Sequence, residues 1–422
     1  MPALLVSKSP PLSGELTVHG AKNSVLPILA ATLLCRTPCV LHNCPDILDV
    51  THALDILRSL GCACERRGTS IYIDPRASTG VSIPQELAGS MRASSLFLGA
   101  LLARAGEALL SLPGGCPIGA RPMDYHLLAF RALGAEVLTT DDAIHCRAKA
   151  MSGARIRLPG PSVGATENAM LAAAGARGVT VIENAACEPE ISDLAGFLIA
   201  CGAGIQGAGT GRITVQGGLQ LSGTTYTILP DRIETATYLC ACAACGGALT
   251  LRRTAPQLVR PLLSALSESG CMVECSHDTI RIRRAAPLTA CQPVVSKPYP
   301  GFPTDAMPLL LAAQLRAQGE TSFTETIFEN RFGYVGELQK LGAELRQEAR
   351  TVRVHGVGQL HAARLCAGDL RGGAALVLAA MQAEGESTIF GVKHIERGYD
   401  NLEAALSRAG ARLKTVEIPM KV

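Results

Sequence analysis

A motif of about 70 residues recurs six times along the chain, and it limits the possible folds more than any other pattern. Its marker is a glycine that follows an amphipathic helical pattern and precedes a strand pattern. Glycine is typical of this place because the residue after a helix C-terminus often takes a left-handed backbone conformation. Six copies in 422 residues predict two lobes of three units each, since one core rarely serves a chain this long. The marker glycines are Gly61, Gly134, Gly202, Gly270, Gly342 and Gly410.

Each unit contains two helical patterns of different character. The first, as in residues 169–178 and 238–247, is apolar on nearly every face and leads into a short strand such as 179–184. The second, as in residues 50–61, has one apolar stripe and is followed by a two-strand hairpin. A helix that is apolar all round is buried, whereas a helix with one stripe packs on the outside. We therefore expect an α/β fold whose sheets carry helices on their inner and outer sides.

Composition excludes several classes of function. The net charge is only +3, aromatic residues make up 4%, and no long Lys/Arg run occurs, so nucleic acid is not expected as a partner. The longest apolar run, Leu26–Cys35, is too short to span a membrane and contains Pro27. No apolar signal segment follows Lys8, so we expect a cytoplasmic protein whose 16 cysteines are reduced thiols.

The loop Ser111–His126 is the first candidate functional segment. Its glycines and prolines exclude a regular helix and a central strand, and they allow a backbone to approach a ligand closely. Cys116 lies in this loop with Arg121 five residues on. A nearby cation favours the thiolate, so this thiol could donate or accept a proton. The alternative is an ordinary core cysteine, which is the usual role of this residue.

Other charged or polar residues stand where the inner helices are expected to begin. A helix N-terminus favours anions, so an added Lys or Arg there makes a phosphate or carboxylate site. Simple capping would explain an Asp or Ser at these places, but it does not explain a cation, whose charge opposes the helix dipole. The candidates at helix starts are Lys22–Asn23, Arg92, Ser162–Gly164, Asp231–Glu234, Asp305 and Asp369–Arg371, and those in loops after strands are Cys116, Arg121, Glu188, Glu329, Arg331 and Arg397.

Three other motifs predict no site. Residues 202–207 match G-x-G-x-x-G, but they end a helical pattern instead of opening one, as a dinucleotide site requires. Cys240, Cys242 and Cys245 do not share a helical face, and the cysteines of residues 35–44 straddle a helix end and a strand, so no metal is expected. No serine elbow, P-loop or H-E-x-x-H pattern supports hydrolysis or phosphoryl transfer.

Seven segments are long and specific enough to compare with a known family: residues 20–34 (GAKNSVLPILAATLL), 112–122 (LPGGCPIGARP), 229–239 (LPDRIETATYL), 302–307 (FPTDAM), 324–332 (TETIFENRF), 369–371 (DLR) and 394–399 (HIERGY). Together they resemble the UDP-N-acetylglucosamine 1-carboxyvinyltransferase family of enolpyruvyl transferases, from about Gly14 to the C-terminus. The resemblance implies two inside-out α/β barrel lobes, with the active site in the cleft between them. One lobe would be 22–229, with the cysteine loop, and the other 1–21 plus 230–422.

The resemblance implies transfer of the enolpyruvyl group of phosphoenolpyruvate to the 3-hydroxyl of UDP-N-acetylglucosamine, with release of phosphate. This is the first committed step of peptidoglycan biosynthesis, a cytoplasmic reaction that serves cell-wall formation, cell shape and division and is the target of fosfomycin. The family implies small-molecule substrates, no cofactor and no metal. Two alternatives remain: an enzyme like 5-enolpyruvylshikimate-3-phosphate synthase, and a sugar-nucleotide binder without activity.

The resemblance also implies roles for single residues. Cys116 would be the proton donor and the site of a pyruvate adduct, Asp305 the base for the sugar hydroxyl, and Arg397 a third catalytic residue. Some family members have a lysine before S-V-G, but here Gly160 and Pro161 stand there, so the uridine contacts would be mostly with the backbone. The implied phosphoenolpyruvate-binding residues are Lys22, Asn23, Arg121, Arg371 and Arg397, and the implied UDP-N-acetylglucosamine-binding residues are Arg92, Arg121, Pro122, Met123, Asp124, Tyr125, Ser162, Val163, Gly164, Asp305 and Ile327.

Overall fold

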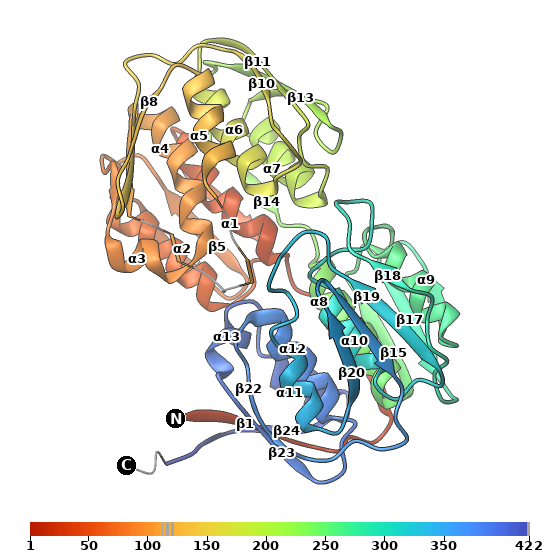
Figure 1. Cartoon of the computed structure of the whole chain (residues 1–422). Coiled ribbons are helices and arrows are strands. Elements are labelled where there is room, and N and C mark those ends of the chain that lie inside the picture. Colours follow the sequence, from red (N-terminus) through yellow and green to blue (C-terminus); the bar gives the residue numbers. More distant parts are fainter. Residues whose placement is uncertain (112, 115–117, 120–121, 420–422) are drawn as a thin grey trace. The chain divides into compact units, whose positions relative to one another are not determined.

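The structure is a computed structural model that describes residues 1–111, 113–114, 118–119 and 122–419 (Figure 1). Its contacts divide the chain into two compact units, and each has a hydrophobic core of its own. The described residues of 20–114 and 122–229 form what we call the N-terminal unit. The C-terminal unit comprises residues 1–19, 118–119 and 230–419.

Each unit contains three four-stranded sheets that share one strand order. An edge strand runs parallel to the second strand, and the second, third and fourth strands pair antiparallel in turn. In the N-terminal unit the sheets are β14 (Thr225–Thr227), β3 (Cys39–His42), β5 (Ser70–Asp74), β4 (Ala63–Arg67); β6 (Ser82–Ile83), β7 (Glu107–Ser111), β9 (Ala143–Arg147), β8 (Glu136–Thr139); and β10 (Arg155–Arg157), β11 (Gly178–Glu183), β13 (Arg212–Gly217), β12 (Gly204–Gln206).

The C-terminal unit repeats this order, and the start of the chain supplies two of its strands, β1 and β2. The strand β1 fills the third place of its last sheet, where Leu4 lies opposite Ile389 and Thr415 (Figure 1). The sheets are β2 (Leu12–Thr17), β15 (Gly247–Arg252), β17 (Thr279–Arg284), β16 (Met272–Cys275); β18 (Val294–Val295), β19 (Glu320–Thr324), β21 (Thr351–His355), β20 (Glu344–Glu348); and β22 (Arg364–Cys366), β23 (Glu386–Phe390), β1 (Pro2–Ser7), β24 (Arg412–Glu417).

The first helix of each repeat is buried, as predicted. Every residue of α10 and α12 is buried, because small apolar side chains cover all faces of these helices. The 3-10 turn η1 continues α1, and η2 precedes α4. The inner helices are α1 (Lys22–Ala31) with η1 (Thr32–Leu34), α4 (Phe97–Ala105) with η2 (Arg92–Leu96), and α6 (Val163–Gly175) in the N-terminal unit, and α8 (Arg232–Cys245), α10 (Met307–Gln314) and α12 (Leu370–Ala380) in the C-terminal unit.

The second helix of each repeat buries one face only, and the predicted glycine ends it. All six marker glycines have φ between 86° and 105°, which confirms the repeat and explains why glycine recurs there. The outer helices are α2 (Leu48–Ser59), α5 (Asp124–Ala132) and α7 (Pro189–Ala200), then α9 (Arg260–Glu268), α11 (Val335–Lys340) and α14 (Leu402–Arg408); α3 (Gln85–Ser90) and α13 (Val392–Glu396) are short additions. Within the described residues, no helix is long and apolar enough to cross a membrane.

The inner helices of the N-terminal unit end together. Leu34, Ala105 and Gly175, at the ends of η1, α4 and α6, line one cavity of about 650 Å³. Three helices that pack together and end together run in one direction, so their negative partial charges meet at this end. Arg104 neutralises them and donates hydrogen bonds to the carbonyl oxygens of Leu33 and Pro75 at 2.6 Å each.

We expect Arg104→Gln to lower the free energy of unfolding by about 2–4 kcal/mol, because it removes charged hydrogen bonds and leaves helix-end carbonyls without a donor. Urea unfolding followed by circular dichroism measures this change. The control is Arg67→Gln, which removes an exposed pair with Glu65 and should cost less than about 1 kcal/mol. Equal costs for the two variants would contradict the role of Arg104.

Candidate active site

Lys22 and Asn23 begin α1 in the N-terminal unit. The Nζ atom of Lys22 lies 2.8 Å from Oδ2 of Asp49, a buried residue in the first turn of α2. This carboxylate compensates a cation that would otherwise oppose the positive end of the α1 dipole. Asp49 was not predicted from the sequence, although its place one residue into an outer helix next to a predicted site could have suggested it.

Arg92 starts η2, and its Nη2 atom lies 3.3 Å from Sδ of Met123. Met123 is buried and precedes α5, which brings the predicted residues Asp124 and Tyr125 onto the same element. A Cβ atom on Gly160 would lie 4.0 Å from the Tyr125 hydroxyl. The predicted segment 122–125 therefore lies close to the segment that leads into α6.

Ser162 caps the N-terminus of α6, and its Oγ accepts a hydrogen bond from Ala165 N at 3.4 Å. Thr166 ties this turn to the next loop, because its Oγ1 donates to Ser162 O at 2.8 Å and accepts from Ala186 N at 3.0 Å. Ser162, Val163 and Gly164 themselves stay partly exposed. The first turn of α6 can therefore present backbone N–H groups to an anion.

His126 lies beneath this surface and is held by Asn168. Its Nδ1 accepts from Asn168 Nδ2 at 2.7 Å, and Asn168 also donates to Ser95 O and accepts from Gly99 N. Burial, with a contribution from the charge of Arg92, lowers the pKa of His126 to about 3. The imidazole is therefore neutral, and it links α5 to the inner helices α4 and α6.

Asp305, just before α10, is the centre of a charged cluster in the C-terminal unit. Its Oδ1 accepts from Arg331 at 2.6 Å, and its Oδ2 accepts from Nε of Arg371 at 3.4 Å. Both arginines are buried. Burial alone would raise the pKa of Asp305, but the charges of Arg371, Arg331 and Arg232 outweigh it and hold the pKa of this carboxyl well below its usual range.

Arg371 has more donor capacity than its neighbours use. Its guanidinium lies 5.3 Å from the ring centre of Tyr399, and the buried Nη1 makes no hydrogen bond to the described residues. Asp369 caps α12 by accepting from Arg371 N and Gly372 N at 3.0 Å each, which fixes the backbone below this guanidinium. A buried, unused cationic donor is suited to an anionic ligand.

Two further predicted residues of the C-terminal unit, Arg397 and Ile327, lie at loop positions, whereas Asp231–Glu234 lie at the start of α8. Arg397 follows α13 directly, and Ile327 lies in the loop after β19. The buried carboxylate of Glu325 shapes that loop, since it accepts from Ile327 N at 2.6 Å and from Ser296 Oγ at 2.7 Å. Arg331 was among the candidates in loops after strands. Glu325 belongs to the segment 324–332 that carries the resemblance, but it was not predicted as a site residue.

Cys116 and Arg121 lie outside the residues that the structure describes, so both remain predictions from the sequence. The described start of their loop shows why glycine is needed there. A Cβ atom on Gly114 would lie 1.8 Å from the carbonyl oxygen of Gly89, so only glycine fits.

A family model and several known proteins match nearly the whole chain. A family model described as EPSP synthase (3-phosphoshikimate 1-carboxyvinyltransferase) matches residues 6–406. The chain is 46% identical over 95% of its length to UDP-N-acetylglucosamine 1-carboxyvinyltransferase 2 of Caldanaerobacter subterraneus, which it covers to 96%. It is 44% identical over 99% of its length to the UDP-N-acetylglucosamine 1-carboxyvinyltransferase of Halorhodospira halophila, covered to 100%.

Among solved structures, the chain is similar to the enolpyruvyl transferase NikO from Streptomyces tendae, with a TM-score of 0.89 and 27% identity over 99% of both chains. It is also similar to EPSP synthase from Acinetobacter baumannii, with a TM-score of 0.76 over 99% of this chain and 100% of that one. That likeness, at 18% identity, shows a shared fold alone.

The lowered pKa of His126 predicts a pH dependence of stability. Unfolded histidine takes up a proton near pH ~6.5, while the folded state resists protonation down to about pH 3, so stability falls as pH drops through this window. Between pH 6.5 and 4.5, we expect His126→Gln to lose about 2–3 kcal/mol less unfolding free energy than the wild type. Urea unfolding at both pH values tests this, with His277→Gln, an exposed histidine, as the control. Identical losses in the wild type and His126→Gln would contradict it.

Proposed function

Since the chain belongs to the enolpyruvyl transferase family that the EPSP synthase model describes, we propose that it transfers the enolpyruvyl group of phosphoenolpyruvate to the 3-hydroxyl of UDP-N-acetylglucosamine. The observation that carries this choice of acceptor is the 43–46% identity to several relatives with that name over nearly the whole chain. The reaction releases phosphate and is the first committed step of peptidoglycan synthesis. The EPSP synthase structures, at 18% identity, support the fold but not shikimate 3-phosphate as the acceptor.

The reaction needs one proton at the methylene carbon of phosphoenolpyruvate and the removal of one from the sugar hydroxyl. The hydroxyl oxygen bonds to C2, C3 gains a proton, and phosphate then leaves as C3 returns a proton. Cationic groups must hold the phosphate and the carboxylate throughout. We assign these cations to Lys22, Arg121, Arg371 and Arg397, with Asn23 as a neutral donor. The donor capacity at Nη1 of Arg371 supports its assignment.

Asp305 is assigned to the sugar hydroxyl. A carboxylate paired with two arginines is a weak base, so it accepts a proton readily only when part of that positive charge is taken up by another anion. Phosphoenolpyruvate bound at Arg371 would supply that negative charge. Basicity at Asp305 would therefore rise when both substrates are present, which suppresses unproductive proton transfer in the free enzyme.

The sugar nucleotide is assigned to residues of the N-terminal unit together with Asp305 and Ile327. Arg92, the segment 122–125 and the open first turn of α6 at Ser162–Gly164 supply one cation and several backbone donors. Such groups suit the diphosphate and the uracil carbonyls, and they need no lysine near Ser162.

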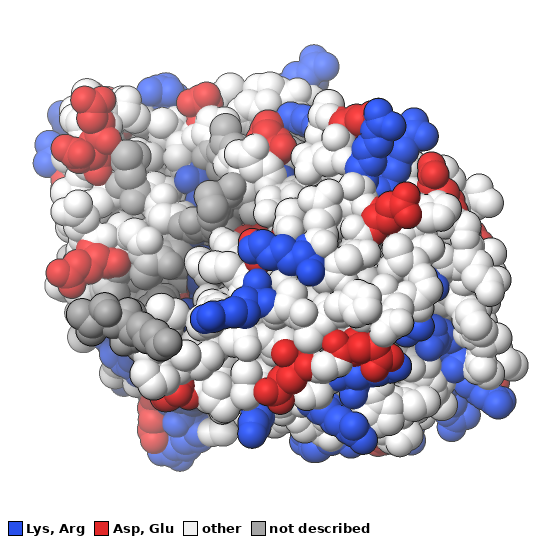
Figure 2. Space-filling model, turned by 60° about the horizontal axis from the view of Figure 1, so that its bottom comes forward, with Lys and Arg blue, Asp and Glu red and all other residues white. Residues whose placement is uncertain are grey.

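Small-molecule partners also fit the surface charge. On the face shown in Figure 2, blue Lys and Arg atoms occur in separate groups among red acidic and white neutral atoms, without a continuous basic track. That nucleic acid is not a partner remains a prediction from the sequence. A cytoplasmic location remains a prediction from the sequence.

Asp305→Asn should depress kcat by about 10²–10⁴-fold and raise KM for the sugar nucleotide much less, because the lost interaction belongs to proton transfer. Phosphate release with both substrates measures the effect, and shikimate 3-phosphate in place of the sugar nucleotide should give none. The control is Asp55→Asn, an exposed residue paired with Arg58. If Asp305→Asn changed KM alone, Asp305 would be a binding residue or a helix cap and not the base.

For Cys116 we expect selective alkylation by an epoxide that mimics phosphoenolpyruvate, faster with the sugar nucleotide bound, because nearby cations favour the thiolate. Cys116→Ser should be nearly inactive, whereas Cys116→Asp should keep some turnover and resist the epoxide, since a carboxyl transfers protons but is a poor nucleophile. Peptide mapping and phosphate release test both. Label on another cysteine, or a Ser variant with near-normal turnover, would refute the assignment.

A further inference from the structure

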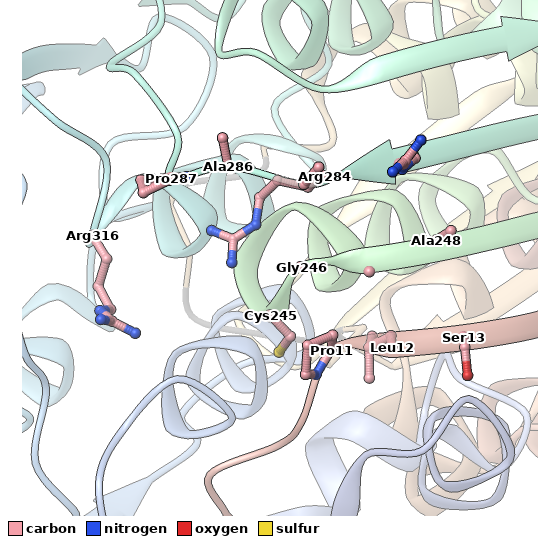
Figure 3. Close-up of a pocket in the computed structure, with 13 residues that line it drawn as sticks. Pro11, Leu12, Ser13, Cys245, Gly246, Ala248, Arg284, Ala286, Pro287 and Arg316 are labelled. Carbon is pink, nitrogen blue, oxygen red and sulfur yellow. The ribbon is translucent and has the colours of Figure 1, made fainter.

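A cavity of about 620 Å³ lies in the C-terminal unit at the C-terminal end of α8, away from the residues discussed above (Figure 3). Segments of β2, β15 and β17 and the end of α8 form its walls. Arg283, Arg284 and Arg316 line it, and none of its described lining residues is acidic. This volume is in the range of small-molecule sites, and its charge is positive.

The side chain of Arg284 is held in place but makes little use of its donors. Its Nε is buried without a hydrogen-bond partner among the described residues. A Cβ atom on Gly246 would lie 2.9 Å from Nη2, so the guanidinium rests directly on the backbone at the end of α8. Arg316 approaches the same space from the segment after α10, anchored by a 2.9 Å hydrogen bond from Nη2 to Gly358 O (Figure 3).

A role for Arg284 as a simple helix cap is the main alternative, since a cation near a helix C-terminus is favourable. The N-terminal unit shows how such a cap is built. Arg104 donates to the carbonyl oxygens of Leu33, Pro75 and Ser78 at the corresponding end of its inner helices. Arg284 makes no such bond through Nε, and Arg316 brings a second guanidinium to the same cavity. Neutralising the partial charge at a helix end does not require two guanidinium groups.

We propose that this cavity binds a phosphate-class anion. Guanidinium groups present paired N–H donors to phosphate oxygens, and a doubly charged head group would balance Arg284 and Arg316 together. Pro11, Ala286 and Pro287 add apolar surface to the lining, which suits a carbon skeleton attached to the phosphate. The α8 helix has 14 residues, so the cavity is roughly 20 Å from Asp231 at its other end, and its occupant would not compete with the substrates.

The proposal is tested by titrating inorganic phosphate, pyrophosphate and glucose 1-phosphate into the full chain at constant ionic strength, with hydrogen exchange followed by peptide. We expect saturable protection of peptides that cover residues 245–248 and 283–287, at least tenfold weaker in R284Q/R316Q. R281Q is the matched control, because Arg281 lies on the same strand, pairs with Glu274 and does not line the cavity. Tighter binding of glucose 1-phosphate would identify an organic phosphate as the preferred ligand, and tighter binding of the inorganic ions would identify a free anion; either supports the site.

Absence of protection in these peptides, unchanged protection in R284Q/R316Q, or full displacement by chloride at equal ionic strength would overturn the proposal. Circular dichroism checks that the double variant folds. If it does not, R316Q carries the test with an expected loss of at least threefold, since Arg316 is exposed and its removal leaves the core unchanged. The readout is local to the cavity, so a failure of enolpyruvyl transfer activity would leave its result unaffected.

Discussion

Both units depend on three inner helices that run in one direction. In the N-terminal unit these helices share a cavity at their C-terminal ends. In the C-terminal unit Cys245 at the end of α8 donates a hydrogen bond to Met381 O at the end of α12. Parallel helices add their dipoles, so each unit has one end that favours anions and one that favours cations. Lys22, Ser162 and Asp305 lie at or near the first end. At the second end Arg104 caps the helices of the N-terminal unit, whereas Arg284 and Arg316 make the cavity of the C-terminal unit positive.

The cluster at Asp305 shows how this polarity serves binding. Two buried arginines, Arg331 and Arg371, contact the carboxylate of Asp305. Although burial disfavours the charged form of Arg371, Asp305 and Asp231 together favour it, which raises the pKa of Arg371. The cluster therefore holds its charges in place without a ligand and leaves Nη1 of Arg371 as a donor that no described residue uses.

The repeat, the buried character of its first helices and its glycine caps could be predicted because they depend on local sequence. The positions of Lys22, Asp305 and Arg371 at helix starts followed from the same pattern. The ion pairs of Lys22 with Asp49 and of Asp305 with Arg331 could not be predicted, because the two members of each pair lie on different elements that only the fold brings close. The place of β1 in the last sheet could not be predicted from the repeat either. It depends on pairing between residues about 400 positions apart, which the resemblance implied but composition did not.

That strand has a consequence for how the protein is made. Pro2–Ser7 is synthesised long before its partners Glu386–Phe390 and Arg412–Glu417. The N-terminal unit can fold while translation continues. The sheet that contains β1 can form only after β23 and β24 have been synthesised. During that interval the apolar strand β1 is exposed. Its late pairing has a large entropic cost, because it closes a very long loop of the chain. Completion of the C-terminal unit is therefore a late event that joins strands about 400 residues apart in the chain.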